Sequence, residues 1–108
     1  MDINYNYESH LTRALNCCNL DWGFTVEEYQ DTIQDAVLNG YVDDKRLIGE
    51  LNLAVNSSSY DWILAMQVSG MLHSDHYQRT FDTQQKARDI VLQLLKPWLP
   101  KEGDEDKV

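Results

Sequence analysis

Three groups of side chains in this sequence could do chemistry: a pair of histidines, two adjacent cysteines and a long run of carboxylates. His73 and His76 lie three residues apart with Asp75 between them, a spacing that could bring two imidazoles to one metal ion on a helix. The sequence places no third strong ligand beside them, so we predict no metal site. The polar stretch that contains them, residues 73–80, is expected to connect two helices.

The adjacent thiols of Cys17 and Cys18 would act as nucleophiles or redox groups only where the environment lowers their pKa. Nothing in the neighbouring sequence supplies such an environment, and adjacent cysteines cannot join distant segments by a disulfide. We therefore predict buried thiols that pack as small apolar side chains. The sequence also shows no recognisable setting for a serine or cysteine nucleophile and no glycine-rich phosphate loop. It predicts no catalytic residue, no cofactor and no enzymatic activity.

The run of carboxylates is the most informative of the three groups. Seven of the 18 acidic residues lie between positions 21 and 44, and no Lys or Arg interrupts them. All nine basic residues lie in the remainder, which is close to neutral, so this segment carries most of the formal net charge of −9. Glu27, Asp31 and Asp35 recur every four residues, which places them on one helix face about 6 Å apart. The pattern is typical either of a binding face or of a solvated surface, and both interpretations stay open.

Aromatic residues flank the acidic segment on both sides, and Trp and Tyr are common anchors of protein interfaces. We expect Phe24 to pack in the core, whereas Trp22 and Tyr41 could be either core residues or anchors. The predicted partner-binding residues are the seven acids and these two aromatic residues: Asp21, Trp22, Glu27, Glu28, Asp31, Asp35, Tyr41, Asp43 and Asp44.

The overall charge balance narrows the classes of partner. Nucleic acids and anionic membranes both require a basic face, so a net charge of −9 predicts no direct binding to either. Residues 1–4 lack the basic and apolar regions of a signal peptide, and no apolar stretch approaches the roughly 18 residues of a membrane span. The sequence also has no disulfide framework, which is typical of proteins in a reducing compartment, so we predict a cytoplasmic protein.

The elements that must position these residues are predicted to be helices, because apolar residues recur at three-and-four spacing along most of the chain. The first helix is expected from position 5 or 7 to 18, although the alternation of residues 3–7 could instead begin as a short extended segment. The remaining helices are expected over 25–38, 43–55, 58–72 and 82–96. The segment 62–72 is apolar almost all round, which predicts a central, buried helix.

Helix starts and stops are marked by specific residues. Thr25 with Glu28 forms a capping box, and Phe24 and Tyr29 have the spacing of a hydrophobic staple around it. Asn39-Gly40 predicts a stop, since glycine accepts the left-handed conformation that closes a helix. Further starts are expected at Asp43, at Ser58 with Asp61, and at Asp82 with Gln85. Pro97 predicts an end near Lys96.

These elements predict an all-α fold, a compact bundle of about five short helices in one domain over residues 1–100. Residues 101–108 are charged and poor in apolar side chains, which predicts a disordered acidic tail.

The leading functional hypothesis is a small acidic inhibitor of the immunity or antitoxin type. Nucleases and other nucleic-acid-binding toxins have basic clefts, and an acidic helical face could occupy one. In size, helical class and charge the chain is similar to the acidic helical immunity proteins that protect bacteria from their own nuclease toxins. That similarity implies a basic toxin or nuclease as the partner.

Two other functions are compatible with the same residues. One is a phage- or plasmid-encoded anti-defence protein that imitates the charge of DNA, which competition with duplex DNA would reveal. The other is a helical adaptor or assembly subunit whose partner docks on apolar residues of segment 62–72, while the acids only keep the protein soluble. The oligomeric state is left open by the sequence.

Overall fold

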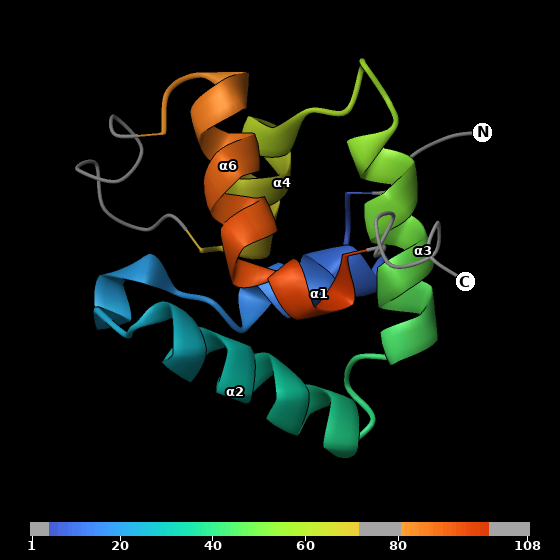
Figure 1. The fold of residues 1–108 in the computed structure, drawn as a ribbon, viewed down its shortest axis with the longest axis vertical. Helices are drawn as coiled ribbons and strands as arrows, with labels where there is room; N and C mark the ends of the chain where they lie inside the picture. Colours follow the sequence, from blue (N-terminus) through green and yellow to red (C-terminus); the bar gives the residue numbers. More distant parts are fainter. Residues whose placement is uncertain (1–4, 72–80, 100–108) are drawn as a thin grey trace, which may run out of the picture.

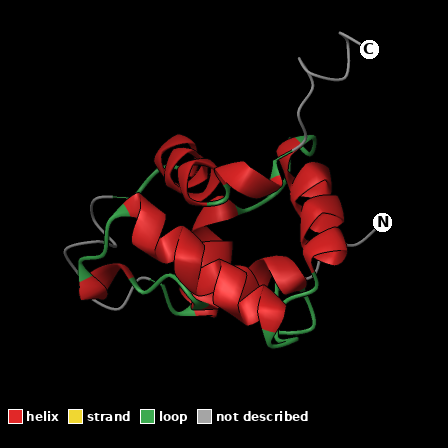
Figure 2. Cartoon of the chain, turned by 60° about the horizontal axis from the view of Figure 1, so that its bottom comes forward, coloured by secondary structure: helices red, strands yellow, loops and turns green. Residues whose placement is uncertain are grey.

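Helices make up all the regular structure in residues 5–71 and 81–99, the part of the chain that the computed structural model describes. No strand occurs within those residues (Figure 2), so the all-α prediction is confirmed. The helices are α1 (His10–Asn16), α2 (Val26–Leu38), α3 (Asp44–Val55), α4 (Trp62–Ser69) and α6 (Gln84–Leu94), with short 3-10 turns η1 (Leu20–Trp22) and η2 (Lys96–Trp98). None of these helices is long and apolar enough to cross a membrane. The segments predicted as the 73–80 connector and the 101–108 tail lie outside the described residues.

α1 lies in the middle of the bundle (Figure 1). α1 contacts α3 on one side and α4 on the other, and α4 in turn contacts α6. α2 lies across the bottom of the bundle in Figure 1 and across its front in Figure 2, and it packs against α6. One long side of α2 is therefore left facing away from the bundle.

The predicted starts of α2 and α3 are confirmed. The Thr25 hydroxyl accepts a hydrogen bond from the Glu28 N–H, and the Glu28 carboxylate accepts one from the Thr25 N–H at 2.7 Å, which completes the capping box. The Asp43 carboxylate caps α3 by accepting from the next residues' amides. Gly40 has a φ of 87°, the left-handed conformation expected after the last turn of α2.

The other helix ends differ from the prediction. α1 begins only at His10, because the Ser9 side chain caps it by accepting from the Thr12 N–H. α4 is capped by Asp61 itself and not by Ser58, and it stops at Ser69 because Gly70 adopts a φ of 80°.

The last helix also departs from its predicted start. The Thr83 hydroxyl accepts from the Lys86 N–H, so Thr83 is the cap in place of Asp82. α6 then ends at Leu94, and Pro97 lies within the following turn, η2.

The core forms where the apolar stripes of the helices meet. Each described α-helix contributes at least one of the largest fully buried side chains. These include Leu11, Leu15, Ile33, Leu47, Leu51, Met66 and Leu94. α4 is only partly central, since it buries Trp62, Ala65 and Met66 but leaves Leu64 and Val68 on the surface. The prediction of a buried fourth helix is therefore wrong, because one side of α4 is not covered by any other described part of the chain.

The start of α1 is held to α3 by the side chains of Glu50, which lies in α3, and of His10, the first residue of α1. The Glu50 carboxylate of α3 accepts from both the Ser9 hydroxyl and the Leu11 N–H, each at 2.9 Å. In the same region the imidazole Nδ1 of His10 accepts from the Asp43 N–H at 2.8 Å. The first turns of α1 and α3 are thus tied together by polar contacts that the sequence pattern does not reveal.

Candidate partner-binding surface

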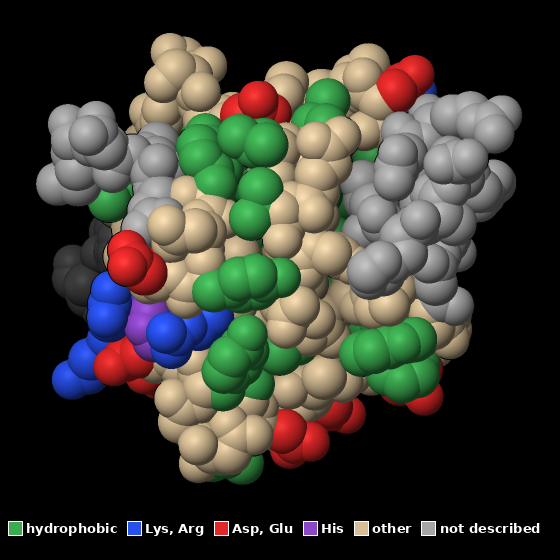
Figure 3. Space-filling view, turned by 180° about the vertical axis from the view of Figure 1, so that it is seen from behind, with side chains coloured by type: hydrophobic (Ala, Val, Ile, Leu, Met, Phe, Trp, Pro, Cys, Tyr) green, Lys and Arg blue, Asp and Glu red, His purple; other side chains and the backbone are tan. Residues whose placement is uncertain are grey.

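The acidic face of α2, defined by Glu27, Asp31 and Asp35, lies on the side of the helix that points away from the bundle. All three side chains are exposed, while Tyr29, Ile33 and Ala36 of the same helix are buried. In Figure 3, which shows the molecule from behind, acidic side chains emerge along the lower edge that α2 forms, whereas Lys and Arg gather at the left. The helical periodicity therefore separates charge from core as predicted.

No basic side chain neutralises this face within the described residues. The ion pairs there are Arg46–Glu50 at 3.9 Å and Lys86–Asp82 at 3.4 Å, and neither involves α2. Three like charges at four-residue spacing repel one another by about 0.2–0.5 kcal/mol per pair. Of these three carboxylates, only that of Glu27 lies in the first turn, where the helix dipole stabilises a negative charge.

Two of the predicted partner-binding acids also hold helix caps. Glu28 belongs to the capping box of α2. Asp43 accepts from the backbone N–H groups of Lys45 and Arg46 at 3.0 and 3.2 Å. The hydrogen bond from Arg46 is the main reason that the pKa of the Asp43 carboxyl is lowered. Asp44 follows in the first turn of α3 and is exposed, and Asp21 lies in η1.

An aromatic cluster of Trp22, Phe24 and Tyr29 lies at the N-terminal end of α2. The rings of Trp22 and Phe24 are 5.4 Å apart, and those of Phe24 and Tyr29 are 5.2 Å apart. Trp22 is 51 % exposed and Phe24 is 42 % exposed, so the expectation that Phe24 lies in the core is wrong. Phe24 contacts Tyr29 as a hydrophobic staple would, but its ring stays on the surface at the start of α2. Two exposed aromatic rings, Trp22 and Phe24, therefore lie side by side.

Tyr41 lies at the opposite end of α2 and belongs to a tyrosine network with Tyr7, Arg13 and Asn16. Its hydroxyl donates to Asn16 Oδ1 at 3.3 Å, and the Asn16 amide donates to the Tyr7 hydroxyl at 3.4 Å. Arg13 donates to the main-chain carbonyls of Tyr7 and Tyr41, and its guanidinium lies 5.5 Å from the centre of the Tyr41 ring. Burial raises the pKa of the Tyr41 hydroxyl, so it remains a neutral donor. Tyr41 is 39 % exposed.

The predicted residues therefore form a line and not a single spot. Trp22, Glu27 and Glu28 share one end of α2, Asp31 and Asp35 follow along it, and Tyr41 lies beyond its other end. A helix of 13 residues is roughly 20 Å long, so the line fits within the roughly 800 Å² that one partner contributes to a standard protein interface. Tyr7, Arg13 and Asn16 were not predicted, because no sequence spacing links the first turns of the chain to position 41.

The residues with catalytic or metal-binding potential do not assemble a site within the described ranges. Burial raises the pKa of both the Cys17 and the Cys18 thiols, so neither is poised as a thiolate. In residues 5–71 and 81–99 no three His, Cys, Asp or Glu side chains gather as ligands for a metal ion. His73, Asp75 and His76 lie outside those ranges.

No family model, no curated protein and no solved structure matches the chain.

Proposed function

We propose that the chain is an inhibitory binding protein of the immunity or antitoxin type, which neutralises a basic toxin or nuclease through the acidic face of α2. The observation that carries the proposal is the combination of two features of α2: the carboxylates of Glu27, Asp31 and Asp35 are exposed and have no ion-pair partner in the part of the chain that the structure describes, and exposed aromatic rings lie at one end of the same helix. A cationic cleft would supply the positive charge that this face lacks among the described residues.

The carboxylates are expected to act mainly on the rate of association. A face of one sign raises the on-rate for an oppositely charged partner by about 10 to 10³-fold, and the gain falls steeply as salt is added. Binding to a cationic surface would also relieve the repulsion along α2.

The aromatic cluster is expected to act mainly on the rate of dissociation. Trp22 and Phe24 offer a flat apolar surface next to Glu27 and Glu28, and buried aromatic anchors dominate the energy of many interfaces. Truncation of Trp22 to alanine should weaken binding by about 2 kcal/mol or more with little dependence on salt.

The test begins with the tagged protein as bait in source-cell lysate, washed in steps of rising salt, to identify a stoichiometric basic partner. Association with that purified partner is then measured for Asp31→Lys/Asp35→Lys. The matched control, Asp82→Lys/Asp89→Lys, makes the same charge change at two exposed acids, one just before the cap of α6 and one within that helix. We expect the α2 variant to associate at least about tenfold more slowly at low salt, and the control to stay near the wild-type rate. Equal rates for the two variants would refute a specific role for the acidic face.

The adaptor is the second candidate, because Leu64 and Val68 leave an apolar strip on α4 beside Tyr7, whose hydroxyl donates to the Val68 carbonyl at 3.2 Å. A partner that remains bound at high salt and is lost in Leu64→Ser/Val68→Ser would favour that function. Competition by duplex DNA for the partner would instead favour an anti-defence protein.

A further inference from the structure

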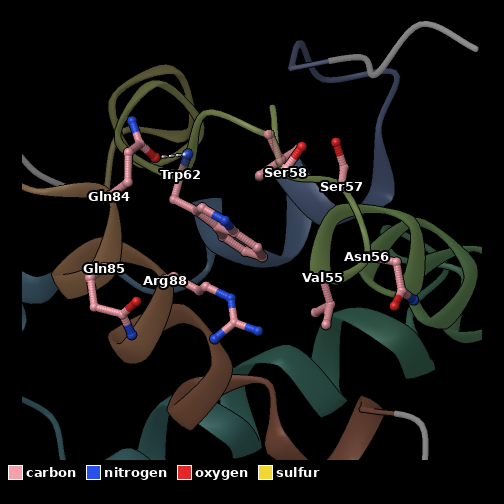
Figure 4. A pocket seen from close by; sticks show the side chains of 9 residues that line it. Val55, Asn56, Ser57, Ser58, Trp62, Gln84, Gln85 and Arg88 are labelled. Carbon is pink, nitrogen blue, oxygen red and sulfur yellow. Dashed lines mark hydrogen bonds between the residues drawn. The ribbon is translucent and has the colours of Figure 1, made fainter.

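A pocket of about 410 Å³ opens between the end of α3, the start of α4 and the first turns of α6 (Figure 4). None of the residues that line it belongs to α2 or to the tyrosine network. Its floor includes the buried rings of Tyr60 and Trp62, which meet edge to face at 4.6 Å. Its rim carries hydroxyl and amide side chains, among them Ser57 and Ser58.

Arg88 is the single charged side chain among the described residues that line this pocket. It is half-buried, and Figure 4 shows it extending from α6 into the space between Trp62 and Val55. Within the described residues it makes neither a hydrogen bond nor an ion pair. The adjacent acid, Asp89, instead accepts from the Gln85 amide at 2.7 Å. A partly desolvated guanidinium without an acceptor is costly, and a bound anion would supply one.

The polar neighbours of Arg88 favour an anion over a neutral polar ligand. The Gln84 amide is already committed, since its oxygen accepts from the Trp62 N–H at 2.6 Å and its nitrogen donates to Asp61 at 2.7 Å. The Ser58 hydroxyl is exposed at the rim and free to donate. No carboxylate in residues 5–71 or 81–99 lines the pocket, although the chain as a whole carries a formal charge of −9.

We propose that this pocket binds a small organic monocarboxylate, with its carboxylate on the Arg88 guanidinium and its apolar part toward Val55 and Trp62. The planar guanidinium fork matches a carboxylate in two parallel hydrogen bonds. One positive charge balances one negative charge, so a dianion such as phosphate would keep an uncompensated charge in a protein that is already strongly acidic. The site is separate from the acidic face, and its test is independent of the proposed function.

The test is a titration of the ¹⁵N-labelled full chain by NMR, with benzoate as the monocarboxylate probe, benzamide as its neutral counterpart and inorganic phosphate as the dianion. We expect saturable benzoate shifts at the amides of residues 55–58 and 84–88 and at the Trp62 indole, and at least about tenfold weaker binding of the other two probes.

Arg88→Gln should weaken benzoate binding about tenfold or more, and the same spectra report that the variant is folded. Lys86→Gln removes an exposed cation from the same helix and should leave the affinity unchanged. The proposal is overturned if benzoate gives no saturable shift, if benzamide or phosphate binds as well as benzoate, or if the two variants behave alike.

Discussion

Replacement of Glu50 by alanine should destabilise the fold far more than its place on the surface of α3 suggests. The Glu50 carboxylate receives hydrogen bonds from the Ser9 hydroxyl and the Leu11 N–H, each at 2.9 Å. Hydrogen bonds to charged groups contribute about 1.5–3 kcal/mol each, and partial exposure of Glu50 favours the lower end. The ion pair with Arg46, at 3.9 Å, adds little because the Arg46 side chain is exposed. Two such bonds at the lower end of that range give an expected loss of about 3 kcal/mol.

Urea unfolding at pH 7, followed by circular dichroism, would measure this loss, which corresponds to a fall in Tm of roughly 12–24 °C for a domain of this size. Glu50→Gln retains an acceptor oxygen and should lose about half as much. Asp35→Ala is the control, because it removes an exposed carboxylate without a partner in the described part of the chain and should change stability by less than about 0.5 kcal/mol. If Glu50→Ala unfolded like this control, the assignment of Glu50 as a cap of α1 would be wrong.

Two further predictions concern titration and reactivity. Burial and the nearby charges of Arg46 and Arg13 lower the pKa of His10, so the unfolded chain binds the proton more readily. The stability due to neutral His10 is therefore fully present above the unfolded pKa of 6.5, and it is lost as the pH falls through the lower pKa of the folded state. In urea unfolding between pH 7.5 and 5, the free energy of unfolding should decline less steeply in His10→Asn than in wild type. Burial raises the pKa of both thiols, and Cys18 is fully enclosed. Cys18 should therefore react with a thiol reagent only as fast as the protein unfolds, while half-buried Cys17 should react sooner. Equal, rapid labelling of both cysteines would contradict this burial.

Much of the helical framework could be predicted because its signals are local. The capping box at Thr25, the cap at Asp43 and the glycine stop at Gly40 each depend on residues within one turn of the helix end. The errors lie where neighbouring residues compete for one role. Thr83 and Asp82 could both cap α6, and Asp61 and Ser58 could both cap α4; sequence alone does not say which backbone is extended.

The candidate surface was only partly predictable, for a different reason. Exposure of Glu27, Asp31 and Asp35 follows from periodicity within one helix. The exposure of Phe24 depends on how η1 meets α2, and the contacts of Tyr41 depend on the packing of α1 beside the α2–α3 turn. The pocket at Arg88 likewise combines α3, α4 and α6, segments whose proximity is a property of the tertiary fold.

The shortness of α1 has a consequence for how the protein folds and fluctuates. Seven residues are too few for a stable isolated helix, which needs about 12–15 even in a favourable sequence. α1 exists because Glu50 holds its first turn and because Leu11, Ala14 and Leu15 are covered by its neighbours. The helix at the centre of the molecule is therefore conditional on its surroundings, and it should form late, once α3 and α4 have converged. In native-state hydrogen exchange its amides should open together with those of α3, as one cooperative unit.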